Sequence, residues 1–147
     1  MKISTRGRYG LRILIDIALY DLASKPRMVR EIAENQGISE KYISHLIIDL
    51  RKAGFIKSIR GAGGGYRLAK SPQQIKLSDI IEVMEGPINL VSCAEKNKIC
   101  QRSALCPAKD IWQQISQEFR AVLAKYTLQD FLDQYMTNGE RFLDYCI

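Results

Sequence analysis

The chain has 147 residues, 46% of them hydrophobic, and a formal charge of +6 with an isoelectric point near 9.2. This length fits one domain with a modest core, and the positive charge favours nucleic acid as the partner, with a solvated basic surface as the alternative. No apolar run approaches the ~20 residues of a membrane helix and no secretory core follows the N-terminus, so we expect a cytoplasmic protein that does not enter a membrane.

Apolar residues spaced three and four apart predict three helices in the first part of the chain. The first spans 8–23, and the second spans about 29–36 and ends at Gly37. Ser39 is the predicted N-cap of the third helix, which ends near Gly54. Two helices joined by so tight a turn indicate a helix-turn-helix, whose second helix inserts its polar face into the major groove of DNA.

A small β-hairpin is predicted next, with strands at 55–59 and 66–69 and a glycine-rich turn at 61–65. Added to the helices, it makes a winged helix, a mainly α fold with a small β-wing. Arg60 at the tip of this wing is placed to reach a phosphate or a narrow minor groove. The polar face of the third helix is the other predicted DNA contact, with Lys41, Ser44 and His45.

Beyond the wing, Ser78 is predicted to cap a short helix over 79–85, and Pro107 to open a long helix. The long helix carries an apolar stripe that comprises Ile111, Trp112, Ile115, Phe119, Val122, Leu123 and Tyr126. We interpret the stripe as a dimerisation surface, because a lone helix leaving a small domain has little else to cover it; packing on the winged domain is the alternative.

Thr127 and Asp130 resemble a capping box that starts a final short helix through Tyr135. The predicted organisation is therefore a winged helix-turn-helix domain at 1–70, a connecting helix and cysteine loop at 71–106, and a dimerisation helix with a C-terminal helix and tail at 107–147.

Three cysteines, Cys93, Cys100 and Cys106, lie in one polar stretch that has too few large apolar residues to bury their thiols as core. Stable disulfides are rare in the cytoplasm, so the trio indicates a metal site or redox chemistry, with an unliganded polar loop as the alternative. A fourth cysteine, Cys146, lies in the tail. A thiol enzyme is disfavoured, because the chain has no Cys-x-x-Cys pair and its single histidine lies on the helix proposed to read DNA.

The segments 3–10 (ISTRGRYG) and 60–66 (RGAGGGY), together with the cysteine trio, resemble the Rrf2 family of transcriptional regulators. The resemblance covers nearly the whole chain and implies a homodimer that binds a palindromic DNA operator. The DNA-contacting set expected from the residues and the resemblance together is Arg6, Ser39, Lys41, Tyr42, Ser44, His45, Arg51, Arg60 and Gly61.

The trio itself resembles the branch of the family that holds an iron–sulfur cluster, 2Fe–2S or 4Fe–4S, in the loop before the dimerisation helix. By this resemblance Cys93, Cys100 and Cys106 are the thiolate ligands of the cluster. Zinc is the main rival metal, but it would demand a fourth good ligand that the loop does not display.

The chain departs from that branch at its fourth ligand. Six residues separate Cys93 from Cys100, one more than in the better-known members, and Lys109 stands where some members have a histidine. Arg8 stands where others have an acidic residue. A protonated lysine is a poor ligand for iron. The fourth ligand stays open among Asp110, Glu95, Cys146, a solvent species and a small thiol.

We therefore expect a homodimeric regulator, not an enzyme, whose DNA affinity is controlled by an iron–sulfur cluster. Its two recognition helices would enter successive major grooves roughly 34 Å apart. The tail also resembles the family's cysteine-metabolism repressor, which lacks the trio. The alternative is thus a cluster-free regulator that responds through thiol oxidation, zinc or a protein partner such as a cysteine-biosynthesis enzyme.

Overall fold

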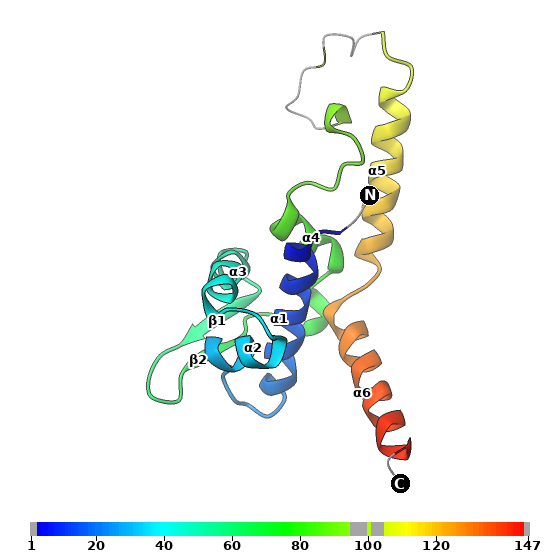
Figure 1. Cartoon of the computed structure of the whole chain (residues 1–147). Coiled ribbons are helices and arrows are strands. Elements are labelled where there is room, and N and C mark those ends of the chain that lie inside the picture. The colour runs from blue at the N-terminus through cyan, green and yellow to red at the C-terminus, as the bar shows by residue number, and fades with distance from the viewer. Residues whose placement is uncertain (1–2, 95–99, 101–104, 146–147) are drawn as a thin grey trace.

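The computed structural model describes residues 3–94, 100 and 105–145 and is mainly helical, with one two-stranded antiparallel sheet (Figure 1). The elements in chain order are α1 (Thr5–Asp21), α2 (Val29–Gln36), α3 (Glu40–Lys52), β1 (Ile56–Ile59), β2 (Gly65–Leu68), the short 3-10 helix η1 (Pro72–Gln74), α4 (Leu77–Glu85), a second 3-10 helix η2 (Ser92–Ala94), α5 (Lys109–Ala124) and α6 (Leu128–Tyr145). The predicted fold class, a winged helix-turn-helix with a long additional helix, is confirmed.

The three N-terminal helices enclose the main core. Its fully buried side chains include Ile13, Leu14, Ile17, Ile32, Ile43, Leu46 and Leu50. Helix α1 begins at Thr5, earlier than the predicted residue 8, because the Ser4 hydroxyl accepts a hydrogen bond from the backbone N–H of Gly7 and caps it. Helix α2 ends as predicted at Gly37, whose φ of 65° is the left-handed conformation that glycine adopts without strain.

The wing is a hairpin in which Ile56 pairs with Leu68 and Ile59 with Gly65. Both strands agree with the prediction to within a residue. The hairpin projects to one side of the helical core, away from α5 and α6 (Figure 1). Lys57 and Ser58 of β1 are exposed to solvent.

The predicted cap of α4 was wrong. The helix begins at Leu77, its N-cap is Lys76, and Ser78 is fully buried with its hydroxyl bonded to Asp79. A bridge between distant segments sets this start: the N–H of Leu77 donates to the carbonyl of Tyr126 at 2.9 Å. The local sequence of α4 does not contain that partner, so a cap inferred from spacing alone fell two residues too late.

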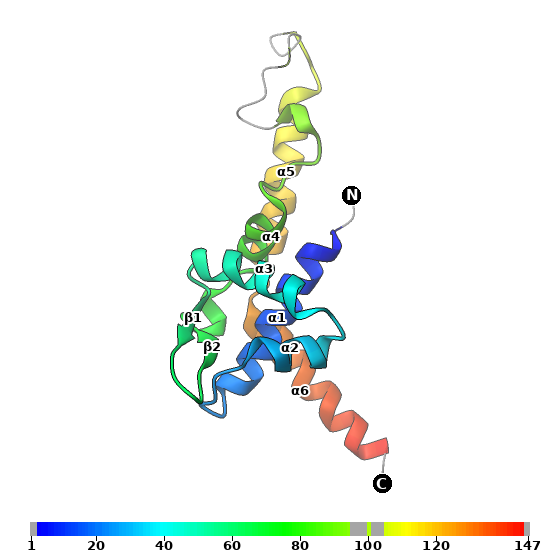
Figure 2. The same ribbon diagram turned by 60° about the vertical axis from the view of Figure 1, so that its left-hand side comes forward.

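Helices α5 and α6 leave the winged domain in opposite directions, and α5 leads toward the cysteine segment (Figures 1 and 2). Helix α5 begins two residues after Pro107. Helix α6 continues to Tyr145 instead of ending at the predicted Tyr135. Gly139 lies within this helix and has no positive φ, so it does not end the helix. Cys146 falls outside the described residues.

None of the helices in the described ranges is both long and apolar enough to span a bilayer.

Candidate nucleic-acid interface and cysteine loop

Helix α3 presents the predicted DNA-reading residues to solvent. The Ser39 hydroxyl accepts from the backbone N–H of Tyr42 at 3.3 Å, which fixes the first turn. The opposite face is buried through Ile43, Leu46, Ile47 and Leu50. The amphipathic rotation therefore leaves an exposed face that comprises Lys41, Ser44, His45 and, about two turns further on, Arg51. Such a face supplies both hydrogen-bonding groups and positive charge.

Tyr42, also predicted to contact DNA, is half-buried and packs against α1. Its ring meets Tyr9 edge to face, with centroids 6.2 Å apart. The guanidinium of Arg12 lies 5.1 Å from the centroid of the Tyr9 ring and donates to Gln36 at 2.7 Å. The contact between the rings of Tyr42 and Tyr9 joins α3 to α1 and fixes the orientation of α3.

One basic residue of the predicted interface, Arg6, forms an ion pair within the chain, and so does Arg67 of the wing, which was not predicted to contact DNA. Arg6 pairs with Asp49 of α3, and Arg67 of β2 pairs with Asp21 of α1. Within the described ranges, Lys41, Arg51 and Arg60 have no such carboxylate partner, so their charge is available to a phosphate. The structure thus divides the predicted basic set into residues that also join elements and residues that face outward.

Arg60 and Gly61 lie at the exposed tip of the wing. Gly61 has a φ of 110°, which a residue with a side chain would adopt only with strain. The wing is bonded to the segment between α1 and α2 through Tyr66, near the turn end of β2, whose backbone forms both hydrogen bonds of an antiparallel bridge with Arg27 at 2.9 Å.

Sequence reasoning missed one group beside this interface, the buried ion pair of Asp16 and Arg27. The Arg27 Nε donates to the Asp16 carboxylate at 2.7 Å, and both residues are more than nine-tenths buried. A signal was present, since Asp16 is a lone acid in the most apolar stretch of the first helix. A buried charge requires a partner, and that requirement could have directed the search.

The three cysteines do not meet. Cys93 is half-buried in η2, Cys106 is half-buried just before α5, and Cys100 between them is exposed. Across residues 3–94, 100 and 105–145, no three His, Cys, Asp or Glu side chains gather as a metal site. Of the proposed fourth ligands, Asp110 lies exposed in the first turn of α5, and Glu95 and Cys146 lie outside the described residues.

The N-terminal arm of the cysteine loop is anchored to α5. The hydroxyl of buried Ser116 accepts from the N–H of Leu90 at 3.1 Å and donates to the carbonyl of Trp112. Further along, Arg120 donates twice to Glu82 of α4, at 2.7 and 2.9 Å, and these bonds raise the pKa of Arg120 above its usual value. Helix α5 is thereby fixed both to the segment that follows α4, through Leu90, and to α4 itself, through Glu82.

Only part of the apolar stripe on α5 is covered. Leu123 and Phe119 pack against Ile81 and Ile88. The remaining apolar side chains are exposed: Ile111, Trp112, Ile115, Val122 and Tyr126. The alternative, packing on the protein itself, holds for one edge of the stripe, while the other edge faces solvent and its role as a dimerisation surface stays a prediction.

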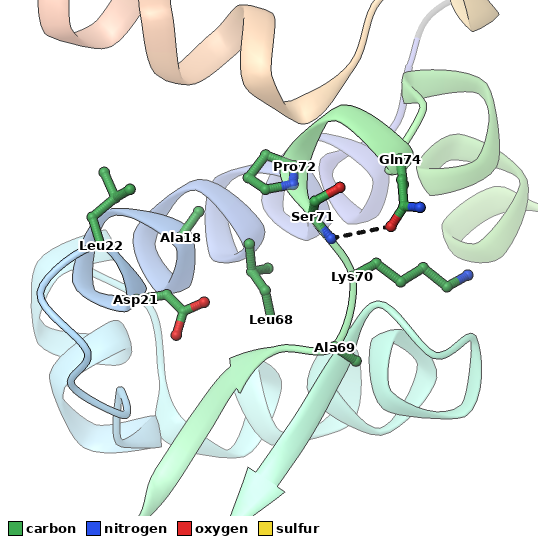
Figure 3. A pocket seen from close by; sticks show the side chains of 9 residues that line it. All are labelled: Ala18, Asp21, Leu22, Leu68, Ala69, Lys70, Ser71, Pro72 and Gln74. Carbon is green, nitrogen blue, oxygen red and sulfur yellow. Dashed lines mark hydrogen bonds between the residues drawn. The ribbon is translucent and has the colours of Figure 1, made fainter.

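A shallow pocket of about 380 Å³ lies between the C-terminal end of α1, the end of β2 and η1 (Figure 3). Its floor is formed by Ala18 and Leu68 and its rim by Asp21, Lys70 and Gln74. None of the predicted site residues lines it.

The family model that describes the Rrf2 proteins, iron-dependent transcriptional regulators, matches residues 3–134. The chain belongs to the Rrf2 family. Its Rrf2 relatives include protein rrf2 of Nitratidesulfovibrio vulgaris, 41% identical over 90% of this chain and 87% of the relative, and CymR of Bacillus subtilis, 42% identical over 96% and 95%. IscR of Vibrio campbellii is 33% identical over 90% of this chain and 77% of its own length.

Solved Rrf2 structures give the same picture. CymR of B. subtilis, described as the global cysteine regulator, superposes with a TM-score of 0.70 at 38% identity and covers 91% of this chain and 98% of its own. IscR of T. potens also has a TM-score of 0.70 at 38% identity, over 92% and 88%. The predicted family is confirmed, and so is the prediction of a transcriptional regulator in place of an enzyme.

Proposed function

We propose that this Rrf2 protein is a homodimer that binds a palindromic DNA operator in the cytoplasm and whose DNA affinity is set by an iron–sulfur cluster. The cluster, 2Fe–2S or 4Fe–4S, would be held by the thiolates of Cys93, Cys100 and Cys106. The single observation that carries the proposal is the position of these thiols. All three lie in the one segment that joins the end of α4 to the start of α5, the helix with the exposed apolar surface.

DNA binding is supported by the two exposed basic elements of the winged domain. Lys41, Ser44 and His45 on α3 suit the major groove, whereas Arg60 and Gly61 at the wing tip suit the backbone or the minor groove. Affinity contributed by lysine and arginine at phosphates falls steeply with salt, because binding releases counterions from the duplex.

Dimerisation is supported by the exposed edge of the α5 stripe. Trp112 is 40% exposed and Ile111 is 59% exposed, on a helix that extends beyond the winged domain (Figure 2). A second copy of the same helix would cover this apolar surface and relate two recognition helices by a two-fold axis.

The donor set fits an iron–sulfur cluster. Three thiols are supplied by one segment, and thiolates are the usual protein ligands of such clusters. The fourth position is open among Asp110, Glu95, Cys146, solvent and a small thiol, while Lys109 is a poor candidate. When bound, the cluster would supply an iron centre whose oxidation or loss changes the charge and the restraint on this loop.

The chain offers a physical route from the loop to the recognition helix. Glu85, at the end of α4, accepts from the N–H of Ser4 at the start of α1. Two residues after Ser4, in the first turn of α1, Arg6 pairs with Asp49 of α3. A shift of the loop that moved α4 would therefore act on α3 through α1, provided that the two states differ in ligand affinity.

A cluster-free regulator is the second candidate, acting through thiol oxidation, zinc or a protein partner such as a cysteine-biosynthesis enzyme. It is favoured by the 42% identity to CymR and by the separation of the three thiols in this structure.

One experiment separates the two candidates. Protein is purified without oxygen from iron-rich cells, and its visible absorption, iron and sulfide are measured, together with its affinity for a duplex selected from a random pool. The proposal expects a coloured protein whose DNA affinity changes at least tenfold when the cluster is removed. Replacing Cys93, Cys100 and Cys106 by serine should abolish the colour, whereas Ser92→Ala, next to Cys93, should keep it. A colourless protein whose affinity for the duplex is the same before and after treatment to remove a cluster would favour the second candidate.

A further inference from the structure

We propose that Arg27, anchored by Asp16, is a positioning residue that fixes the DNA-contacting wing relative to the helix-turn-helix. The inference rests on the proposed function, because it takes Arg60 at the wing tip as a DNA contact. Neither Arg27 nor Asp16 faces the DNA-reading surface, and we assign them no contact with DNA.

The carboxylate of Asp16 joins α1 to the turn of the helix-turn-helix. One oxygen accepts from Arg27 at 2.7 Å. The other accepts from the side-chain amides of Asn35 and Gln36, the last two residues of α2. Because Gly37 and α3 follow at once, this carboxylate helps to set where the recognition helix begins.

Arg27 joins the same carboxylate to the wing. Its guanidinium stacks on Tyr20, 3.7 Å from the ring centroid, and lies 3.6 Å from Glu31. Its backbone forms the two-bond bridge to Tyr66 of β2. The contact is close, since a Cβ atom added at Gly65 would lie 2.7 Å from the Arg27 carbonyl group. Arg27 thus acts as a third, one-residue strand of the wing.

The burial of this pair indicates a role in geometry more than in stability. Buried ion pairs often stabilise a fold no more than apolar residues of the same volume would, because desolvation offsets the attraction. A placement of the wing that moved Arg27 away from Asp16 would leave the buried Asp16 carboxylate without its cationic partner, with only the amides of Asn35 and Gln36 to bind it. Asp16, with side-chain exposure of 1%, therefore admits one arrangement of wing and helix.

The test is a double-mutant cycle on DNA affinity. Arg60→Ala, Arg27→Lys and the double variant are compared with wild type on a 30-base-pair duplex selected by the wild-type protein from a random pool. We expect Arg60→Ala to weaken binding about five- to tenfold and to lower the salt slope by about 1 in wild type. In the Arg27→Lys background, Arg60→Ala should weaken DNA binding less than twofold and change the salt slope by close to zero. The reason is that a displaced wing no longer places Arg60 against the DNA.

Arg120→Met is the matched control, since it also removes an ion pair between two elements, but between α5 and α4. Its effect should add to that of Arg60→Ala. Additive effects in the Arg27→Lys background would overturn the inference. If Arg27→Lys does not fold, Asp16→Asn, which keeps the shape of the side chain and removes its charge, takes its place in the same cycle. If the wild-type protein binds no duplex, the proposed function itself is refuted. If it binds and the effects of the two substitutions are additive, only the inference about Arg27 is refuted.

Discussion

The carboxylate of Glu85 accepts a hydrogen bond from the backbone N–H of Ser4 at 2.8 Å, so the last residue of α4 satisfies a donor at the start of α1. The N-terminus of a helix carries unpaired N–H groups and the positive end of the helix dipole, both of which favour a carboxylate. Glu85 is also the last helical residue before the segment that leads to Cys93. One contact thus joins the helix before the cysteine loop to the helix that carries Arg6.

Replacing Glu85 by alanine should lower the free energy of unfolding by about 1 kcal/mol, because the start of α1 loses an acceptor and a favourable charge. Urea unfolding of the cluster-free protein measures the change. Glu34→Ala is the control, since Glu34 is an exposed residue of α2 whose carboxylate contacts Arg30 alone among the described residues, at 3.6 Å. It should cost less than about 0.5 kcal/mol. Equal losses in the two variants would show that Glu85 is no more than a surface charge.

Gly10→Ala should destabilise the protein by about 1–3 kcal/mol through overpacking. A Cβ atom at Gly10 would lie 2.6 Å from both Cγ and Sδ of Met84, so the buried Met84 side chain or the packing of α1 on α4 would have to shift. Gly139→Ala is a matched control within α6, where an added Cβ meets nothing within 4 Å. It should stabilise the protein by about 0.5–1 kcal/mol, because alanine favours the helix. Thermal unfolding of both variants tests the pair, and a stable Gly10→Ala would contradict the packing described.

The sequence was sufficient where the signals are local. Gly37 and Ser39 mark the end of one helix and the start of the next within three residues, and both act as predicted. The wing followed from its glycine run in the same way. These elements form the candidate DNA interface, and Lys41, Ser44, His45 and Arg60 are exposed on it as expected, while their contact with DNA stays a prediction.

What the sequence could not supply depends on contacts between distant segments. The start of α4 is set by Tyr126, and the orientation of Arg6 by Asp49, neither of which is near in the chain. Asp16 and Arg27 were missed for the same reason. The geometry of the cysteine trio is a separate problem, because spacing fixes the order of three ligands along a loop but not where the loop brings them together.

Replacing Ile115 by aspartate should convert a dimer into a monomer. Ile115 is 38% exposed on the open edge of the α5 stripe, and a carboxylate there would be buried without a partner in the proposed dimer. We expect the dimer dissociation constant to rise by about 100-fold or more. Light scattering after size-exclusion chromatography gives the mass. Gln117→Asp adds the same charge at an exposed position of the same helix, outside the stripe, and should leave the mass unchanged. The same mass for wild type and both variants would remove α5 as the interface.

Stability in acid should report the cap of α6. The carboxylate of Asp130 accepts from the backbone N–H of Thr127 at 2.6 Å and from its hydroxyl at 2.9 Å, and these bonds lower the pKa of Asp130 in the folded protein. A carboxyl whose pKa is lowered by folding stabilises the folded state above its unfolded pKa, and this contribution is lost as the pH falls through the folded value. Wild type should therefore melt at a higher temperature than Asp130→Asn at pH 7, and the difference should shrink below about pH 4. Asp133→Asn, one turn further along α6 and not at the cap, separates this effect from general loss of negative charge. A gap between wild type and Asp130→Asn that stays constant from pH 7 to pH 3 would show that the ionised cap contributes nothing to the start of α6.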